Sequence, residues 1–144
     1  MGTLGTFKVT GGKLLVTDPC YDVGTWCQGV LKNVKNGTWE AETDIVSGRV
    51  GTLRITAVGE TPSGPWFDQD FDVGVDSGQA GFFTYAKFPK GDRDSCGGSY
   101  GRDKFYDQCC EATIGGKGGI VEGTGVVSQS GWGDGGYLCR TRRN

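Results

Sequence analysis

The chain has 144 residues, with 28 glycines, no histidine, and 15 basic residues against 17 acidic ones. This length fits one domain, and we expect a single β-rich domain over residues 1–144. The lack of histidine excludes a serine–histidine–aspartate triad, a cysteine–histidine dyad and histidine-ligated metal sites. The net charge of −2 and the lack of a long basic run argue against binding of long nucleic acids.

The composition favours β-strands over helices. Val outnumbers both Leu and Ala, and Phe, Tyr and Trp add 16 aromatic residues. Short stretches of alternating or continuous apolar residues are separated by glycine-rich turns. We therefore predict an all-β fold of eight to ten short antiparallel strands, arranged as a sandwich or a partly closed barrel.

The first strands are predicted near the N-terminus. Alternation in residues 7–9 and an apolar run in residues 13–17 flank Gly11-Gly12, and Asp18-Pro19 ends the second run. This pattern predicts a β-hairpin with its turn at the two glycines.

A second hairpin is predicted around Asn36-Gly37, which is a strong signal for a two-residue hairpin turn. It would join residues 30–35 to residues 38–43 and pair Val34 with Trp39. The register would place apolar side chains on one face and acidic ones on the other.

The remaining strands are read from apolar alternation and from the spacing of glycine clusters. Residues 89–102 have the Gly, Asp and Ser content of a long loop. Residues 104–110 have a short helix as the alternative to a strand. The predicted strands cover residues 50–58, 71–76, 81–88, 105–114, 119–127 and 137–141.

The six cysteines are even in number but contain no Cys-x-x-Cys pair. We expect a cytoplasmic protein with reduced, buried thiols, because no leader segment or membrane-length apolar run is visible. If a phage encodes the chain, the compartment is the cytoplasm of its host. We predict no cofactor, no metal ion and no membrane partner.

Three motifs place carboxylates beside glycine, proline or aromatic residues at expected strand ends, where β-scaffolds display binding groups. Aromatic rings can stack on a base or sugar, carboxylates and amides can read polar edges, and basic side chains can hold phosphates. The alternative is structural, with aspartates bonding backbone amides and aromatic rings filling the core. The candidate ligand-binding residues are Asp18, Tyr21, Trp26, Asp76, Gln79, Arg102, Lys104, Trp132, Asp134, Tyr137 and Arg140.

The same motifs resemble those of a bacterial and phage family of domains of unknown function. The matching segments are GGKLLVTDP at residues 11–19, VDSG at 75–78 and SGWGDGGY at 130–137. In order and spacing they span most of the chain. The resemblance implies a β-rich fold and carries no established activity.

These observations favour a non-catalytic module that binds a small polar ligand, such as a nucleotide-type signal of host defence sequestered by a phage or bacterial protein. One alternative is a carboxylate-based hydrolase, in which Asp76, with Asp18 and Asp134, activates water directly or through a metal ion. The other is a protein-interaction module. A homo-oligomer is compatible with each of them.

Overall fold

The computed structural model describes residues 2–89 and 104–143, which form ten β-strands, a 3-10 helix at Tyr85–Lys87 and one α-helix. All strand pairs are antiparallel, and the described strands form three sheets without closing into a barrel. The all-β prediction and the number of strands are confirmed. The elements are β1 Gly2–Val9, β2 Leu14–Thr17, β3 Gly29–Leu31, β4 Gly37–Val46, β5 Arg49–Ala57, β6 Trp66–Val75, β7 Gln79–Thr84, α1 Lys104–Ile114, β8 Gly118–Val121, β9 Gly125–Gln129 and β10 Gly135–Arg142.

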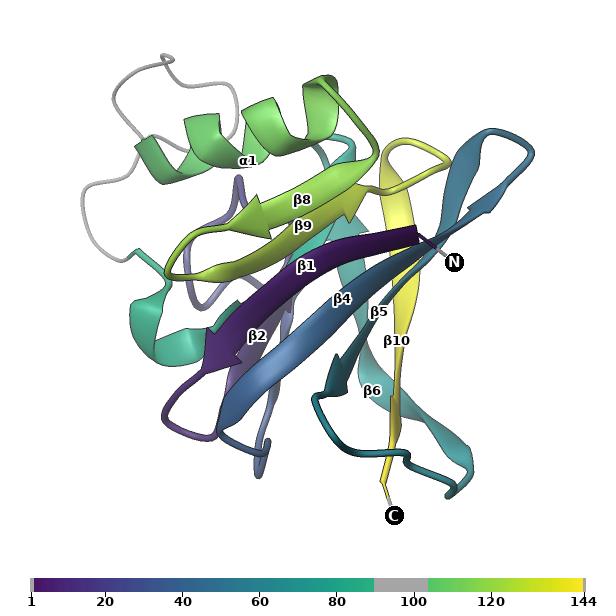
Figure 1. The fold of residues 1–144 in the computed structure, drawn as a ribbon. Coiled ribbons are helices and arrows are strands. Elements are labelled where there is room, and N and C mark those ends of the chain that lie inside the picture. Colours follow the sequence, from purple (N-terminus) through teal and green to yellow (C-terminus); the bar gives the residue numbers. More distant parts are fainter. Residues whose placement is uncertain (1, 90–103, 144) are drawn as a thin grey trace.

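The central layer is a five-stranded sheet in the order β3-β2-β7-β9-β8. Every residue of β2 is buried, which explains why its sequence is a continuous apolar run instead of an alternating one. Helix α1 packs against β8 and β9 and covers one face of this sheet (Figure 1). On that face Leu15, Phe83 and Val127 meet Phe105 and Cys109 of the helix.

Two separate units cover the other face of the central sheet, so the layers form a sandwich. The three-stranded sheet β1-β4-β5 packs through Phe7 and Ala41 onto Leu14. The two-stranded ribbon of β6 and β10 packs through Val73 and Cys139 onto Val16. Leu14 and Val16 are two residues apart on one strand and so point to the same side. The two units therefore stand side by side over one face, as Figure 1 shows.

Both predicted hairpins are wrong, although their turns exist. Gly11 and Gly12 take positive φ angles of 73° and 69°, but β1 pairs with β4 while β2 pairs with β3 and β7. The Asn36 side chain accepts a hydrogen bond from Gly12 N at 2.8 Å, and Gly12 O accepts one from Val34 N at 2.9 Å. The two turns thus bind each other where the chain crosses between sheets, and neither closes a local hairpin.

The strand predicted at residues 105–114 is instead part of α1, so the helical alternative is correct there and extends to Ile114. Its buried residues, Phe105, Cys109, Cys110 and Thr113, recur with the spacing of one helical face. β-branched and aromatic residues lowered the helical preference of this segment, but packing on the sheet outweighs it. The strand predicted at 119–127 is divided into β8 and β9 by a turn at Gly123, and the loop predicted at 89–102 lies outside the described residues except for Pro89.

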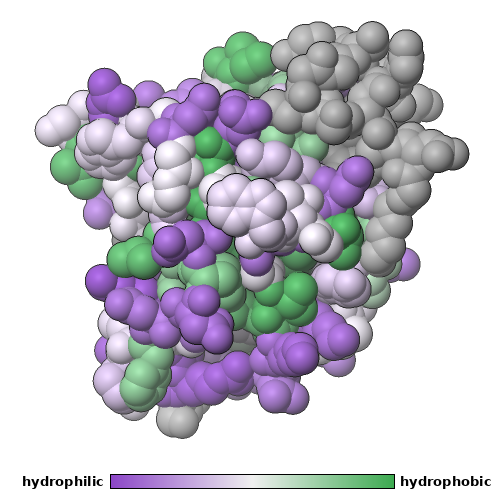
Figure 2. All heavy atoms as spheres, turned by 180° about the vertical axis from the view of Figure 1, so that it is seen from behind, coloured by the Kyte–Doolittle hydropathy of each residue, from purple (hydrophilic) through white to green (hydrophobic). Residues whose placement is uncertain are grey.

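The five described cysteines are buried, as predicted. No helix in the described ranges is long and apolar enough to cross a membrane. In the view from behind, hydrophobic side chains are separated by hydrophilic ones, so the exposed apolar surface of that face is broken into patches (Figure 2).

The contact between α1 and the central sheet can be tested at Phe105. Its ring meets those of Phe83 and Phe88 edge to face, with centroids 5.3 and 5.0 Å away. We expect Phe105→Ala to lower the free energy of unfolding by about 3–4 kcal/mol in urea titrations, because it leaves a cavity in this cluster. Ile114→Ala, at a position on the same helix that is 79% exposed, should change it by less than about 0.5 kcal/mol. Equal effects would contradict the packing of this helix face.

Candidate functional site

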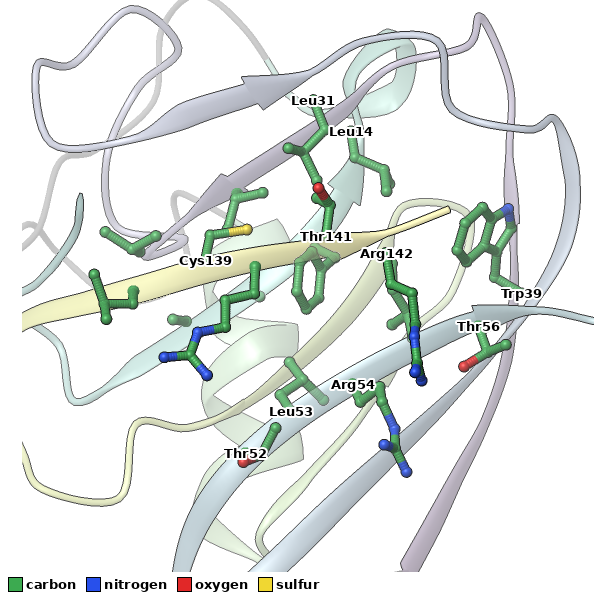
Figure 3. A pocket seen from close by; sticks show the side chains of 18 of the residues that line it. Leu14, Leu31, Trp39, Thr52, Leu53, Arg54, Thr56, Cys139, Thr141 and Arg142 are labelled. Atoms are coloured by element: carbon green, nitrogen blue, oxygen red, sulfur yellow. The ribbon is translucent and has the colours of Figure 1, made fainter. Parts of the chain in front are cut away.

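A cleft of about 1260 Å³ opens between β5 and β10, over the face of the central sheet that the two units share. Figure 3 shows side chains of β5 and β10 gathered around it. Ser130 and Val50 line it, and in the turn at the neighbouring Gly131 an added Cβ would lie 2.0 Å from the Val50 carbonyl oxygen. Arg49 also donates a hydrogen bond to Gly131 O at 2.8 Å. The backbone of this turn is thus held directly against the start of β5.

The floor of the cleft is mainly apolar, with Ser128 and Gln129 of β9 as its polar members. Leu14 and Val16 of β2, Leu31 of β3 and Phe82 of β7 line it from the central sheet. Cys139 of β10 joins them, and burial raises the pKa of its thiol to about 11. At neutral pH this thiol is uncharged and adds to the apolar surface.

The walls of the cleft are strand edges. All residues from 50 to 57 in β5 and from 136 to 142 in β10 line it. Because neighbouring side chains of a strand point to opposite faces, a lining made of consecutive residues means that the edge of each strand borders the space. β5 and β10 are the last strands of their respective sheets. Both therefore present backbone N–H and C=O groups that no strand within residues 2–89 and 104–143 pairs.

The rim of the cleft is positively charged. Among the described residues, five basic and two acidic ones line it, which gives these residues a net charge of +3, whereas the whole chain carries −2. Three of the basic groups lie on β10 or directly after it. The basic residues are Lys35, Arg54, Arg140, Arg142 and Arg143, and the acidic ones are Glu42 and Glu60.

Contacts with the protein hold these arginines in place. Arg142 donates from Nε to Gly64 O at 2.6 Å and lies over the Trp66 ring at 5.2 Å, and Arg143 donates to the Asn33 and Lys32 carbonyls. Arg54 forms an ion pair with Glu42, with Nη2 of the arginine 3.5 Å from Oε2 of the glutamate. A guanidinium has five N–H donors, so the Nε bond of Arg142 leaves its two terminal nitrogens for an anion.

Asp18, the first candidate from the sequence, is a structural group with no exposed surface. Its Oδ1 accepts hydrogen bonds from Cys20 N at 2.9 Å and Ser77 Oγ at 2.6 Å. Its Oδ2 accepts bonds from Asp76 N at 2.8 Å and Ser77 N at 2.7 Å. The carboxylate thus ties the end of β2 to the turn between β6 and β7. We call this set of four bonds the Asp18 latch.

Other candidates surround the latch. Tyr21 is half-buried, and burial raises the pKa of its phenol above the ordinary value, with Cys27, Cys20 and Asp76 adding to the effect. The Asp76 side chain is exposed. Tyr21 thus stays protonated at neutral pH, next to a solvent-facing carboxylate.

Gln79 is buried beneath α1. Its Nε2 donates to Cys110 Sγ at 3.5 Å, and its Oε1 accepts a bond from Thr113 Oγ1 at 3.2 Å. These contacts fasten β7 to the helix. Lys104 is the first residue of that helix, and Arg102 lies outside the described residues.

The C-terminal candidates divide into two groups. Trp132, which is 58% exposed, and Asp134 lie in the turn before β10 and do not line the cleft. Trp26, nearer the N-terminus, is 92% exposed on its own loop and does not line the cleft either. Tyr137 and Arg140 do line it. The Tyr137 hydroxyl donates to Gly133 O at 2.6 Å, and Arg140 Nε donates to Asp68 at 2.7 Å.

The three sequence motifs do meet. The latch joins Asp18 to Ser77, and Ser130 N donates to Gly78 O at 2.9 Å. A hollow of about 310 Å³ lies where the last two motifs touch, and none of the described residues that line it is charged. Within the described ranges, no three Asp, Glu or Cys side chains come together as metal ligands. The motifs therefore build a junction of the fold, and the charged cleft lies elsewhere.

Sequence reasoning missed Arg54, Arg142, Trp39 and Trp66 as residues that line the cleft. Each of them lies in or next to a strand of ordinary alternating pattern, and only the three-dimensional arrangement of the sheets shows which strands are edges. Comparisons with protein-family models, curated proteins and solved structures found no match to the chain. The family resemblance therefore stays a prediction.

The Asp18 latch yields a stability prediction. We expect Asp18→Asn to lower the free energy of unfolding by about 3 kcal/mol in urea titrations, because an amide replaces a buried carboxylate that accepts four hydrogen bonds. Asp76→Asn is the matched control, and its exposed side chain should contribute less than about 0.5 kcal/mol. A neutral Asp18→Asn would show that the latch does not hold this turn.

Proposed function

We propose that the protein is a non-catalytic binding module whose ligand carries negative charge and lies in the cleft between β5 and β10. The observation that carries this proposal is the net charge of +3 on the cleft of a chain whose net charge is −2. The remainder of the chain thus carries −5, which would repel the same ligand elsewhere on the surface. A cleft whose lining carries an excess of one sign of charge concentrates ligands of the opposite sign.

The apolar floor adds a second requirement to the ligand. Leu31 and Phe82 offer no polar group, while Trp39 and Tyr137 offer aromatic surface close to the arginines. A ligand with an anionic end and an apolar or aromatic body satisfies both parts. The nucleotide predicted from the sequence belongs to this class, with its phosphates at Arg54 and Arg142.

The size of the cleft argues for more than a mononucleotide. Its volume of about 1260 Å³ is larger than the roughly 300–1,000 Å³ of sites for drug-sized molecules. In its narrowest form, the proposal places the protein in the cytoplasm of a bacterial or phage-infected cell, where it sequesters a nucleotide signal of host defence.

The hydrolase alternative has less support. It needs the carboxylate of Asp18, which already accepts four hydrogen bonds in a site without exposed surface. Neither Asp76 nor Asp134 lines the charged cleft. The carboxylates that line the cleft among the described residues, Glu42 and Glu60, are held in ion pairs with Arg54 and Lys35.

Native mass spectrometry tests this function directly. The full chain is purified from the cells that naturally express it, and its mass is compared with that of the denatured protein. We expect an anionic species that is released on denaturation. In Arg54→Gln/Arg142→Gln its occupancy should fall at least about tenfold, because each lost charge-assisted contact contributes about 1.5 kcal/mol or more.

Lys8→Gln/Lys87→Gln is the matched control. It removes the same charge from two exposed residues outside the cleft and should leave the occupancy unchanged. A species that the arginine variant retains in full would contradict the proposed site. Turnover of a substrate that Asp76→Asn abolishes would contradict the proposed function.

A further inference from the structure

The two strand edges that border the cleft differ in regularity. The pairing of β10 with β6 has a register shift between Leu138 and Arg140. The pairing of β5 with β4 is regular from Thr52 to Ala57, and its register shift lies before this stretch. A bulge interrupts the ladder of a strand, so the free edge of β5 is the better template for a further strand.

Along this edge the side chains alternate in character. Leu53 and Ile55 pack into the core between the sheets, so Thr52, Arg54 and Thr56 point to the other face. Arg142 of β10 lies across the cleft from this edge (Figure 3). A strand added to β5 would therefore face the apolar floor with every second residue and the arginines with the others.

We propose that the occupant of the cleft is an extended segment of an acidic partner protein, which adds to the edge of β5 as a further strand. The segment alternates apolar residues, which pack on Leu53, Ile55 and the floor, with Asp or Glu residues, which pair with Arg54 and Arg142. Its backbone bonds to the outward N–H and C=O groups of Thr52–Ala57. This inference rests on the general form of the proposed function, an anionic ligand in this cleft, and puts a protein segment in the place of the nucleotide.

The geometry suits recognition by strand addition. In this mode main-chain hydrogen bonds supply affinity and alternate side chains supply specificity. Every second residue of an edge strand points its N–H and C=O away from its neighbour, so about half of the backbone groups of β5 are offered to the cleft. At about 3.4 Å per residue, the regular stretch accepts a partner segment roughly 20 Å long.

The charge of the β5 edge favours an acidic partner over a second copy of the same chain. Two β5 edges brought together would place Arg54 of one chain near Arg54 of the other, and like charges on neighbouring strands destabilise pairing. An acidic strand instead brings carboxylates close to Arg54, and opposite charges on neighbouring strands stabilise pairing. The arginines at the rim thus disfavour self-association and select a strand of opposite charge.

Blocked eight-residue peptides are the probes for this proposal. One alternates Val and Glu, and one alternates Val and Lys. Two further Val/Glu peptides carry N-methyl groups on the Glu amides or on the Val amides, so that each loses the donors of one edge. Binding to the full chain is followed by NMR, with the amides of Thr52–Ala57 as reporters.

We expect the Val/Glu peptide to bind at least tenfold more tightly than the Val/Lys peptide and to shift the β5 amides. Only one of the N-methylated peptides should lose binding, because only one set of amides faces β5. Arg54→Gln should weaken binding about tenfold, and Lys8→Gln should not.

Other results overturn the proposal. Equal binding of both N-methylated peptides would mean that charge alone holds the ligand, so strand addition would be wrong while the anionic cleft stands. If a cyclic dinucleotide binds at Arg54 and no peptide binds, strand addition is also wrong while the anionic cleft stands. Failure of the peptides and of the dinucleotide would overturn both proposals. Concentration-dependent dimers with the β5 amides in their interface would assign the cleft to a second copy.

Discussion

The Asp18 latch is the interaction on which the arrangement of the sheets depends. It lies where the chain leaves β6 of the ribbon and enters β7 of the central sheet, and its four hydrogen bonds fix this passage to the end of β2. Because β2 also carries Leu14 and Val16, one short strand sets where both the three-stranded sheet and the ribbon rest. The space between these two units is the cleft.

This arrangement gives the cleft its chemical character. The shared face of the central sheet makes an apolar floor, and the last strands of two different sheets make walls with unpaired backbone groups. Open edges invite aggregation unless charges protect them. Here the described charges that line the cleft are positive on balance, and we propose that the arginines that discourage self-pairing also attract an anionic partner. In this proposal, one set of residues both protects the edge and recognises the ligand.

The sequence predicted the class of the fold and the course of single strands, because alternation in β5 and β6 and the glycine turns are local signals. It failed where pairing is non-local: β1 lies beside β4, and the Asn36-Gly37 turn bonds to Gly12 instead of closing a hairpin. The motif around Asp18 drew attention to residues that hold the fold, as the structural alternative allowed. Tyr137 was singled out because it ends the SGWGDGGY motif, and Arg140 because a basic side chain can hold a phosphate. The position of Arg54 and Arg142 beside the cleft could not be predicted, since it depends on which strands become edges.

Hydrogen exchange of the backbone amides in the free protein, measured residue by residue by NMR, tests the central claim most directly. If the cleft is open, alternate amides of β5 and β10 should exchange rapidly, while the amides that bond to β4 and β6 stay protected. Uniform protection along both strands would contradict the account, because it would mean that β5 and β10 pair with each other and leave no cleft for a ligand.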